Sequence, residues 1–426
     1  MQHPSTSSGV QSSAEIPLVA HQCLPSTLTD RIPGELHDRI IDHLHSDPSV
    51  LLTCSLVSRA WLRASRHHLI PTLEIRRQNA PMLRKLLGAP YATLDASVRR
   101  LSLRAGKAVS PDRFLGSEIL LLPAVQSLLL SASYLVPVGK LLSWTRCYAH
   151  RLVEFVLYHI KIDSLSEFVE GLNDFKVLRH LAMVGVVWGN SYLPTVVEGS
   201  DTADTDTALL PSLRSLVLTG QAAGLVWWLL ARDIASIARL DLRLKTGRHV
   251  NLEASQVPLD IGRYYRALGS SLQELDLYDP RGDHSKIDLS TNNNLRELWF
   301  HDVVLSLGGW VLDALAQVTS PHLHTITLFI FSDDHGQRVK LDMFNWRAFT
   351  ELLSNTPISP SLKTIRIIWL GYYNFVEFVA AEVLKRLAGQ VPGVELVIIP
   401  DFIGANETTF GATTHGRLFD RRNSVL

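Results

Sequence analysis

Residues 31–69 read RIPGELHDRIIDHLHSDPSVLLTCSLVSRAWLRASRHHL. Apolar side chains recur there at helical spacing in two runs, first Ile32, Leu36, Ile40, Ile41 and Leu44, then Val50, Cys54, Val57 and Trp61. The first run predicts a helix from Pro33 to about His45, and Asp47-Pro48 is a favourable start for a second. Leu52 and Leu56 add a further apolar row to that second helix. About forty residues rarely bury so much apolar surface among themselves, so the stretch is predicted to be a docking module that needs a partner.

The order of these signals resembles an F-box. The resemblance rests on Ile32-Pro33-x-Glu35-Leu36, Ile40-Ile41-x-x-Leu44, Asp47-Pro48 and Leu51-Leu52-x-Cys54-x-x-Val57-Ser58-Arg59-Ala60-Trp61. Ser58 and Ala60 depart from the commonest family pattern, which often has a Cys and a basic residue there. The resemblance, to the fungal type of F-box protein with a leucine-rich-repeat-like C-terminal domain, implies binding to the Skp adaptor of a cullin-type ubiquitin ligase. On that basis the adaptor-binding residues, which face the adaptor or pack the helical hairpin that binds it, are Ile32, Pro33, Leu36, Ile40, Ile41, Leu44, Leu52, Val57 and Trp61. The alternative is that these residues are plain core of a larger helical domain.

The rest of the chain carries an internal repeat. The pattern L-x-x-L-x-L, with Val, Ile, Phe or Met substituting, occurs at Val98/Leu101/Leu103, Val125/Leu128/Leu130, Leu152/Phe155/Leu157, Leu178/Leu181/Met183, Leu213/Leu216/Leu218, Ile237/Leu240/Leu242, Leu272/Leu275/Leu277, Leu295/Leu298/Phe300, Leu323/Ile326/Leu328, Leu362/Ile365/Ile367 and Val394/Val397/Ile399. The number of residues from the start of one copy to the start of the next is mostly close to, or just above, the length of a leucine-rich repeat. The last two apolar residues of a copy lie two apart, so they point to one side of a short strand. One such unit cannot bury that side alone, whereas stacked units can.

These repeats are irregular. No copy has the Asn that regular repeats place three residues after the last apolar position. The segments 225–238, 310–318, 344–354 and 375–387 have helical spacing, so the unit reads as strand, loop and helix. The predicted fold class is α/β: an N-terminal three-helix F-box and then an irregular leucine-rich-repeat solenoid, with a curved parallel sheet and outer helices. The predicted boundaries are a disordered leader at 1–28, the F-box at 29–75, the solenoid at 76–400 and a flexible C-terminal tail at 401–426.

Composition limits the function classes. Lys plus Arg and Asp plus Glu are both 41, so the general electrostatic drive toward nucleic acid or a membrane surface is missing. Three scattered cysteines favour a reducing compartment, and no apolar run is long enough to span a membrane. The motifs of phosphate loops, dinucleotide sites, zinc proteases and serine hydrolases are absent. We therefore expect no catalytic residue, no metal site and no cofactor.

The repeat register predicts a binding face on the inner, concave wall. Residues that flank and separate the last two apolar positions point away from the core. Three adjacent repeats place Arg239, Asp241, Arg243, Glu274, Asp276, Tyr278, Glu297, Trp299 and His301 there. Exposed aromatic side chains ringed by charges are typical of binding hot spots, although cross-strand ion pairs could simply solubilise the sheet. In earlier repeats the corresponding residues Leu129, Val156, Ala182 and Val217 indicate a face covered by a loop or by another chain.

Together these observations predict a substrate-recruiting subunit of a Skp–cullin–F-box ubiquitin ligase. It would bind the Skp adaptor, and through it a cullin, by the F-box, and an unknown protein target by the repeats. No nucleic-acid or membrane partner is expected, and the location is predicted to be intracellular, cytoplasmic or nuclear. One alternative is a non-catalytic repeat scaffold unconnected with ubiquitin. An enzyme is the other alternative, which a cleft gathering His, Asp or Ser side chains would revive.

Overall fold

The computed structural model of the 426-residue chain describes residues 33–89, 97–105, 122–132, 135–190, 210–220, 223–230, 236–244, 261–278, 287–331, 341–355, 360–371, 376–387, 391 and 393–402. The chain divides into two compact units, Met1–Pro71 and Thr72–Leu426. The predicted leader at 1–28, Ile32 and all of the predicted tail after Phe402 lie outside the described residues.

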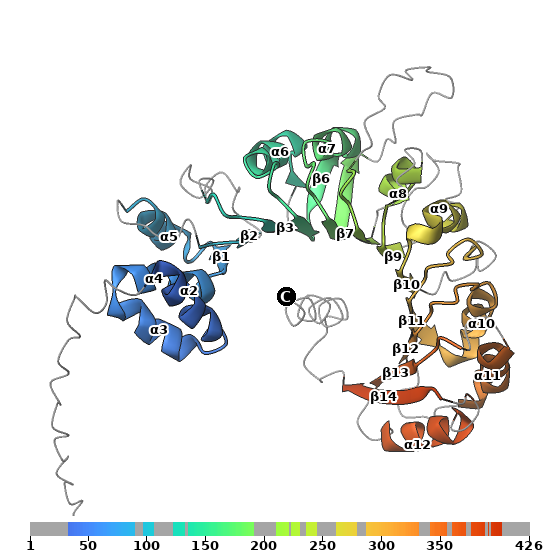
Figure 1. The fold of residues 1–426 in the computed structure, drawn as a ribbon. Helices are drawn as coiled ribbons and strands as arrows, with labels where there is room; N and C mark the ends of the chain where they lie inside the picture. The colour runs from blue at the N-terminus through green and yellow to red at the C-terminus, as the bar shows by residue number, and fades with distance from the viewer. Residues whose placement is uncertain are drawn as a thin grey trace, which may run out of the picture. The chain divides into compact units, whose positions relative to one another are not determined.

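The first unit contains three described helices, α2 (Gly34–His43), α3 (Pro48–Val57) and α4 (Arg59–Leu69) (Figure 1). The Asp47 carboxylate accepts hydrogen bonds from two backbone N–H groups of the first turn of α3, at 3.0 and 3.1 Å, which is the capping predicted for this residue. The unit packs around Ile41, Leu51 and Cys54, all buried. The second helix was predicted to run on to Trp61, but the chain breaks at Ser58, whose extended backbone and hydroxyl cap start α4 instead.

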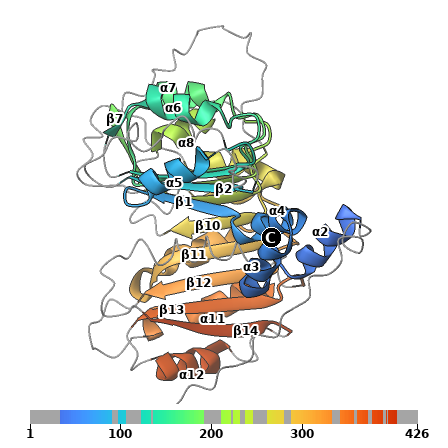
Figure 2. The same cartoon turned by 90° about the vertical axis from the view of Figure 1, so that its left-hand side faces the viewer.

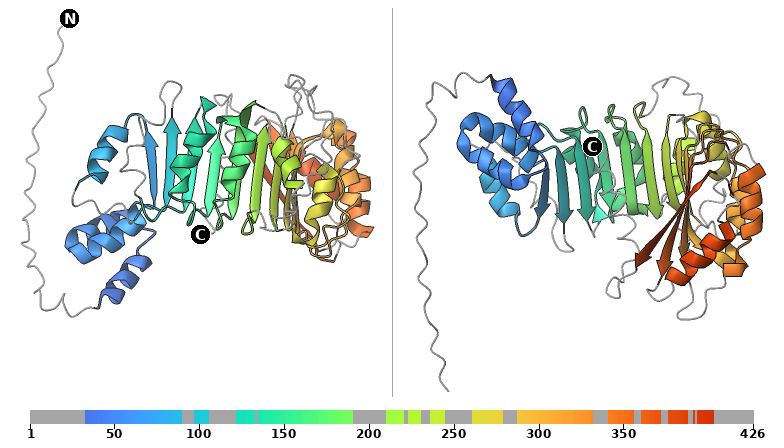
Figure 3. Two further views of the ribbon diagram at one scale, coloured as in Figure 1. Left: turned by 90° about the horizontal axis from the view of Figure 1, so that it is seen from above. Right: turned by 60° about the horizontal axis from the view of Figure 1, so that its bottom comes forward.

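The second unit is built from parallel strands. In the described residues these are β1 (Thr72–Arg76), β2 (Arg100–Ala105), β3 (Ser127–Ala132), β4 (Leu135–Val136), β5 (Glu154–Tyr158), β6 (Lys161–Ser164), β7 (His180–Asn190), β8 (Ser215–Gly220), β9 (Arg239–Leu244), β10 (Glu274–Tyr278), β11 (Glu297–Val304), β12 (Thr325–Phe331), β13 (Thr364–Gly371) and β14 (Glu395–Phe402). They follow the sequence in order across the sheet, except that β4 and β6 pair beside β7. Neighbouring strands lie side by side with their directions aligned (Figures 2 and 3).

Helices cover one face of this sheet. The described ones are α5 (Ala80–Leu87), α6 (Val138–Arg146), α7 (Leu165–Leu172), α8 (Ala223–Leu230), α9 (Ile261–Leu268), α10 (Gly309–Ala316), α11 (Trp346–Asn355) and α12 (Val376–Leu387), with short 3-10 turns η4 (Gly269–Ser271), η6 (Leu305–Leu307) and η7 (Leu341–Met343). The sheet curves, with α6 to α12 on its outer side (Figure 1). No helix has both the length and the apolar composition of a membrane span, within the described ranges. The predicted parallel α/β array with outer helices is confirmed.

The apolar repeat explains the core. Each of the eleven triplets lies at one of the strands β2, β3, β5 and β7 to β14, and from β2 to β13 the middle residues face each other in register, as Leu275 faces Leu298 and Leu298 faces Ile326. These side chains are fully buried. Phe300 lies 5.5 Å from Trp310 of α10, ring centroid to centroid, which places the triplet residues on the helix-covered side. The residues between them therefore face the inner side.

Two sequence-based boundaries need correction. Residues 72–75 were assigned to the helical module, but they belong to β1, because Leu73 and Ile75 alternate toward the buried side of the sheet and pair with β2. The last triplet was placed one residue too late. Leu396 and Ile398 pair with the buried Ile365 and Ile367, so Val397 and Ile399 face the inner side. Apolar residues on both faces of β14 leave its period-two pattern ambiguous.

A bulge in β7 makes one glycine necessary. The register of β7 on β8 shifts between Val184 and Val186, and Gly185 between them has φ of 63°. A Cβ on Gly185 would lie 2.6 Å from Nδ1 of His159.

We expect Gly185→Ala to lower the free energy of unfolding by about 1–3 kcal/mol, since a left-handed residue with a Cβ is strained and this one also clashes. Urea denaturation followed by circular dichroism measures the change. Gly139→Ala in α6 is the matched control, because its Cβ would meet nothing within 4 Å. Its stability should be unchanged or slightly raised, and equal stabilities for both variants would contradict the assignment of strain to Gly185.

Candidate interaction surfaces

The first candidate surface lies on the helices of the first unit. Five large apolar side chains there are exposed to solvent: Leu36 (48%), Ile40 (43%), Leu52 (58%), Leu56 (86%) and Val57 (59%). We call these five residues the apolar helix surface. Leu36 and Ile40 are four residues apart on α2, and Leu52 and Leu56 are four residues apart on α3, with Val57 next to Leu56. Each helix therefore presents an apolar stripe. Full burial of one such side chain is worth about 1.5–3 kcal/mol, and that free energy is available to a partner.

Helix α3 shows why this surface is exposed. The segment PSVLLTCSLV contains no charged residue and is apolar on every side. Leu51 and Cys54 are buried within the unit, whereas Leu52 and Leu56 are not. A helix that is apolar all round is typical of a buried helix. The described part of this unit buries only the side of α3 that carries Leu51 and Cys54, so the opposite side is available to a partner.

The nine residues predicted to bind the adaptor separate into groups. Pro33, Leu36, Ile40, Leu52 and Val57 are exposed, whereas Leu44 and Trp61 are half-buried. The Trp61 ring packs 5.6 Å from that of His37. Ile41 is fully buried on α2, a helix that packs against α4, so within the free chain it belongs to the packing of the helices and not to the exposed surface. Leu56 was not among the nine, although it lies one turn after Leu52 on α3 and is 86% exposed.

The second candidate surface is on the inner face of the sheet across β9, β10 and β11. The parallel register aligns Arg239, Glu274 and Glu297 in one row and Asp241, Asp276 and Trp299 in the next. The third row holds Arg243, Tyr278 and His301, with Tyr278 opposite His301 and the Arg243 guanidinium 5.1 Å from the Tyr278 ring centroid. All nine residues predicted for this face are thus assembled in a single patch. We call it the inner-face patch.

The floor of the patch is more buried than predicted. Trp299 is 8% exposed and Asp241, Asp276 and His301 are 3% or less, so the expectation of an exposed tryptophan was wrong. Trp299 clusters with Phe329, Ile368 and Ile399 from the next three strands. Neighbouring side chains are crowded together on the inside of a curved sheet, with strands about 4.8 Å apart. The rim stays accessible, because the side chains of Arg239, Glu274 and Arg243 are 25%, 40% and 28% exposed.

Stacked rings order the third row. The His301 ring lies between those of Tyr278 and Phe329, with centroids 4.4 and 4.3 Å away and nearly parallel planes. The Arg243 guanidinium covers Tyr278 and pairs with Asp302 at 3.2 Å. Stacks of this kind hold side chains in fixed positions. The patch is therefore a preorganised surface.

Two carboxyl groups lie side by side at the floor of the patch. Oδ1 of Asp276 lies 2.7 Å from Nε2 of His301, and its Oδ2 is 4.0 Å from the guanidinium of Arg239. Burial and the negative charge of Asp276 raise the pKa of Asp241 to about 7, against the opposing effects of His301 and Arg239. Neither oxygen of Asp241 has a well-aligned hydrogen bond in the described structure, and contact with the Tyr278 side chain is the smallest of the effects on its pKa. Unsatisfied buried carboxyl oxygens are rare and costly.

The raised pKa of Asp241 predicts a pH-dependent penalty on stability. The unfolded chain loses this proton above about pH 4, whereas the folded chain keeps it up to about pH 7. The free energy of unfolding of the native chain therefore falls as the pH rises through this window.

Asp241→Asn removes that penalty. We expect the variant to be more stable than the native chain by roughly 2–4 kcal/mol at about pH 8 and nearly equal to it at about pH 4. Urea titrations at the two pH values measure the difference, with Asp313→Asn on the exposed face of α10 as control. A stability gain that does not change with pH would contradict the assignment.

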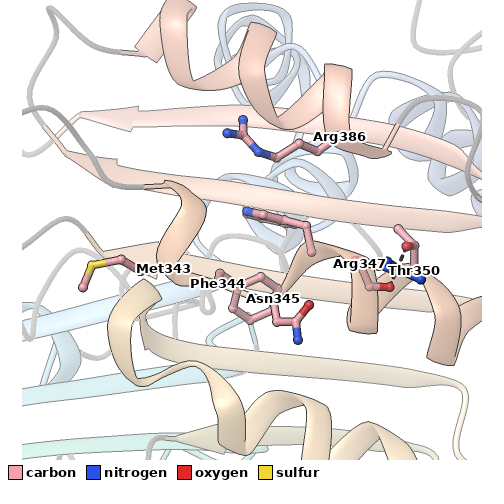
Figure 4. Close-up of a pocket in the computed structure, with 7 residues that line it drawn as sticks. Met343, Phe344, Asn345, Arg347, Thr350 and Arg386 are labelled. Atoms are coloured by element: carbon pink, nitrogen blue, oxygen red, sulfur yellow. Dashed lines mark hydrogen bonds between the residues drawn. The ribbon is translucent and has the colours of Figure 1, made fainter.

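A pocket on the helical side of the sheet has a volume of about 640 Å³ and is lined by Met343, Phe344, Asn345, Trp346, Arg347, Thr350 and Arg386 (Figure 4). Arg347 pairs with Glu351 at 2.8 Å and Arg386 with Glu382 at 2.9 Å. Among the residues lining it there is no nucleophile beside a base. Nor do the described ranges contain a group of three or more His, Cys, Asp or Glu side chains placed to hold a metal ion.

Comparisons with known proteins found little. No protein-family model matches the chain, and no curated protein sequence matches it. Among solved structures, the fold is similar to a chain of the complex of Rad7 and Elc1 from yeast, at 13% sequence identity and a TM-score of 0.36, over 87% of this chain and 94% of that one. This likeness is remote.

Proposed function

We propose that this chain is the target-recruiting subunit of a Skp–cullin–F-box ubiquitin ligase. Residues 33–69 would form the F-box that binds the Skp adaptor, and through it a cullin. The following strand and helix array would be a leucine-rich-repeat solenoid that binds the protein target with its inner face.

The observation that carries this proposal is the exposure of the apolar helix surface. The exposed residues Leu36, Ile40, Leu52 and Val57 are ones that the F-box resemblance assigns to the adaptor. Burying one such side chain would contribute a stabilising free energy on the order of 1.5–3 kcal/mol. The helical unit does not gain this free energy while the four side chains remain in water. A partner with a matching apolar groove recovers that free energy, which is the mode of helix-in-groove recognition.

The inner-face patch is the proposed target surface. It combines charges of both signs with stacked rings on a rigid sheet, and aromatic side chains with arginines dominate binding energy at interfaces. The role of the chain would be non-catalytic: it holds the target beside a ubiquitin carrier and so raises the effective concentration of the reacting groups. The ligase acts inside the cell, so we also propose a cytoplasmic or nuclear location.

Co-expression with the Skp adaptor tests the proposal. The full-length chain and the adaptor should elute from gel filtration as a stoichiometric complex, which then recruits a cullin. If the folded chain elutes alone, the ligase role falls. The inner-face patch would then point to the alternative of an interaction scaffold unconnected with ubiquitin, since it exists without the adaptor.

A further inference from the structure

The middle row of the inner face holds an unusual number of unsatisfied polar atoms. Both oxygens of Asp241, Oδ2 of Asp276 and the Thr327 hydroxyl lack hydrogen-bond partners in the described structure, and all three side chains are at most 1% exposed. They lie on strands β9, β10 and β12 of the same sheet face. Buried polar groups are nearly always satisfied in native proteins. A group that is absent from the free chain would complete this row.

We propose that the Asp241–Asp276 carboxyl pair is the receptor for a basic side chain, preferably arginine, in a peptide segment of the target protein. This inference rests on the proposed function, because it names the chemistry of the target that the inner face recruits. A guanidinium group presents parallel N–H donors that match the two oxygens of a carboxylate. Asp241 offers two such oxygens, neither of which has a well-aligned hydrogen bond in the described structure.

The pair itself is buried, but the rows on either side of it are partly exposed. Arg239 and Glu274 flank the carboxyls on one side, and Arg243 and Tyr278 flank them on the other, all only partly buried. Arg239 is 25% exposed and pairs with Glu274 at 3.1 Å and with Asp276 at 4.0 Å. A bound basic side chain would take its place beside Asp276, so the proposal requires the Arg239 guanidinium to move aside. The slender stem of an arginine or lysine carries its charge to a buried acceptor of this kind.

Apolar clusters on both sides of the pair define the flanking residues of the peptide. On β5, β7 and β8 the cluster consists of Val156, Ala182, Val184 and Val217. On β11 and β12 it includes Trp299 and Phe329. Strands spaced about 4.8 Å apart put these clusters roughly 12 Å and 10 Å from the pair, and an extended peptide advances about 3.3 Å per residue. The matching segment has a basic residue with apolar residues three or four positions before and about three positions after it, or in the reverse direction.

Binding should be linked to the release of a proton. The groups facing Asp241 are Arg239 on its own strand, Asp276 and Tyr278 on β10, and His301 on β11, with Tyr265 of α9 also in its field. Because the pKa of Asp241 is raised to about 7, only about a tenth of the free chains have this carboxyl ionised at pH 6 and about nine tenths at pH 8. The affinity for a cation should therefore rise about tenfold between these pH values.

The experiment uses the purified full-length chain and a positional-scanning library of immobilised twelve-residue peptides. The best arginine-containing peptide is then resynthesised with citrulline, the neutral analogue of arginine, and affinities are measured by fluorescence anisotropy from pH 6 to pH 8. The variants are Asp241→Asn and Asp276→Asn. His301→Gln tests whether the His301 ring is the source of the pH dependence. Glu154→Gln on β5 is a matched control from the same face of the sheet.

We expect arginine to be selected at one position, citrulline and Asp241→Asn each to weaken binding by at least about tenfold, and the rise with pH to be lost in Asp241→Asn but kept in His301→Gln. A library without preference for a basic residue would overturn the inference, and this is the result expected if ordered water is the missing partner of Asp241. A preference for a basic residue that survives both Asp variants would also overturn it. Adaptor binding is measured on the same preparations. Intact adaptor binding without the arginine preference overturns this inference alone, whereas the preference without adaptor binding overturns the ligase role alone.

Discussion

Full-length chain carrying Leu52→Asp and Leu56→Asp is expected to lose binding to the Skp adaptor by at least about 100-fold, because two buried leucines are worth about 3–6 kcal/mol and an unpaired buried carboxylate adds a further cost. These side chains are 58% and 86% exposed in the free chain, so the fold does not depend on them. Isothermal titration calorimetry with the purified adaptor measures the loss.

The matched control is Leu384→Asp, which places the same substitution on an exposed leucine of α12. It should bind the adaptor as the native chain does. Circular dichroism should show that the double variant remains folded. A substitution of the buried Leu51, in contrast, should unfold the helical unit. Native affinity in the folded double variant would show that this surface does not contact the adaptor.

Phe300→Ala is expected to lower the free energy of unfolding by about 3–5 kcal/mol, the usual effect of deleting a fully buried ring. Phe300 is 0% exposed, packs against Trp310 and pairs in register with Leu277 and Leu328 of the adjacent strands. Each unit of a stacked array is stabilised by its neighbours. The cavity should therefore loosen β10, β11 and β12 before the rest of the sheet.

Urea denaturation gives the size of this effect, and amide hydrogen exchange shows where the loosening occurs. Leu307→Ala on η6 is the nearby control, because Leu307 is 60% exposed; its stability should stay within about 0.5 kcal/mol of the native value. Uniform exchange across all strands of the Phe300→Ala variant would mean that the sheet unfolds as one cooperative unit.

Sequence reasoning located the strands because their pattern is local. A triplet such as Leu272/Leu275/Leu277 combines a turn closure with a period of two, and eleven copies in succession leave only a stacked parallel sheet to bury them. The first strand was nevertheless missed. Ile70, Leu73 and Ile75 match the triplet, but Ile70 directly follows the last residue of α4, so strand β1 was taken as part of the helical module.

The inner-face patch was predicted in its membership but not in its environment. Register alone placed Asp241, Asp276 and Trp299 in one row, because parallel strands with matching triplets can align in only one way. Their burial depends on how strongly the sheet curves and on which side chains the next strands supply. Phe329 and Ile368, one and two strands away from Trp299, cover it. No local pattern reports that.

The sequence by itself determined the repeating strand, loop and helix unit, the helical module before it and, from β2 to β13, the face on which the triplet side chains lie, because these follow from spacing along the chain. Only the tertiary structure decided that Ile41 packs inward while Leu56 faces solvent, and that Asp241 is left buried without a hydrogen-bond partner. The physical reason is that exposure and pKa are set by neighbours that are distant in sequence. Such neighbours meet only when the helices pack and the sheet curves.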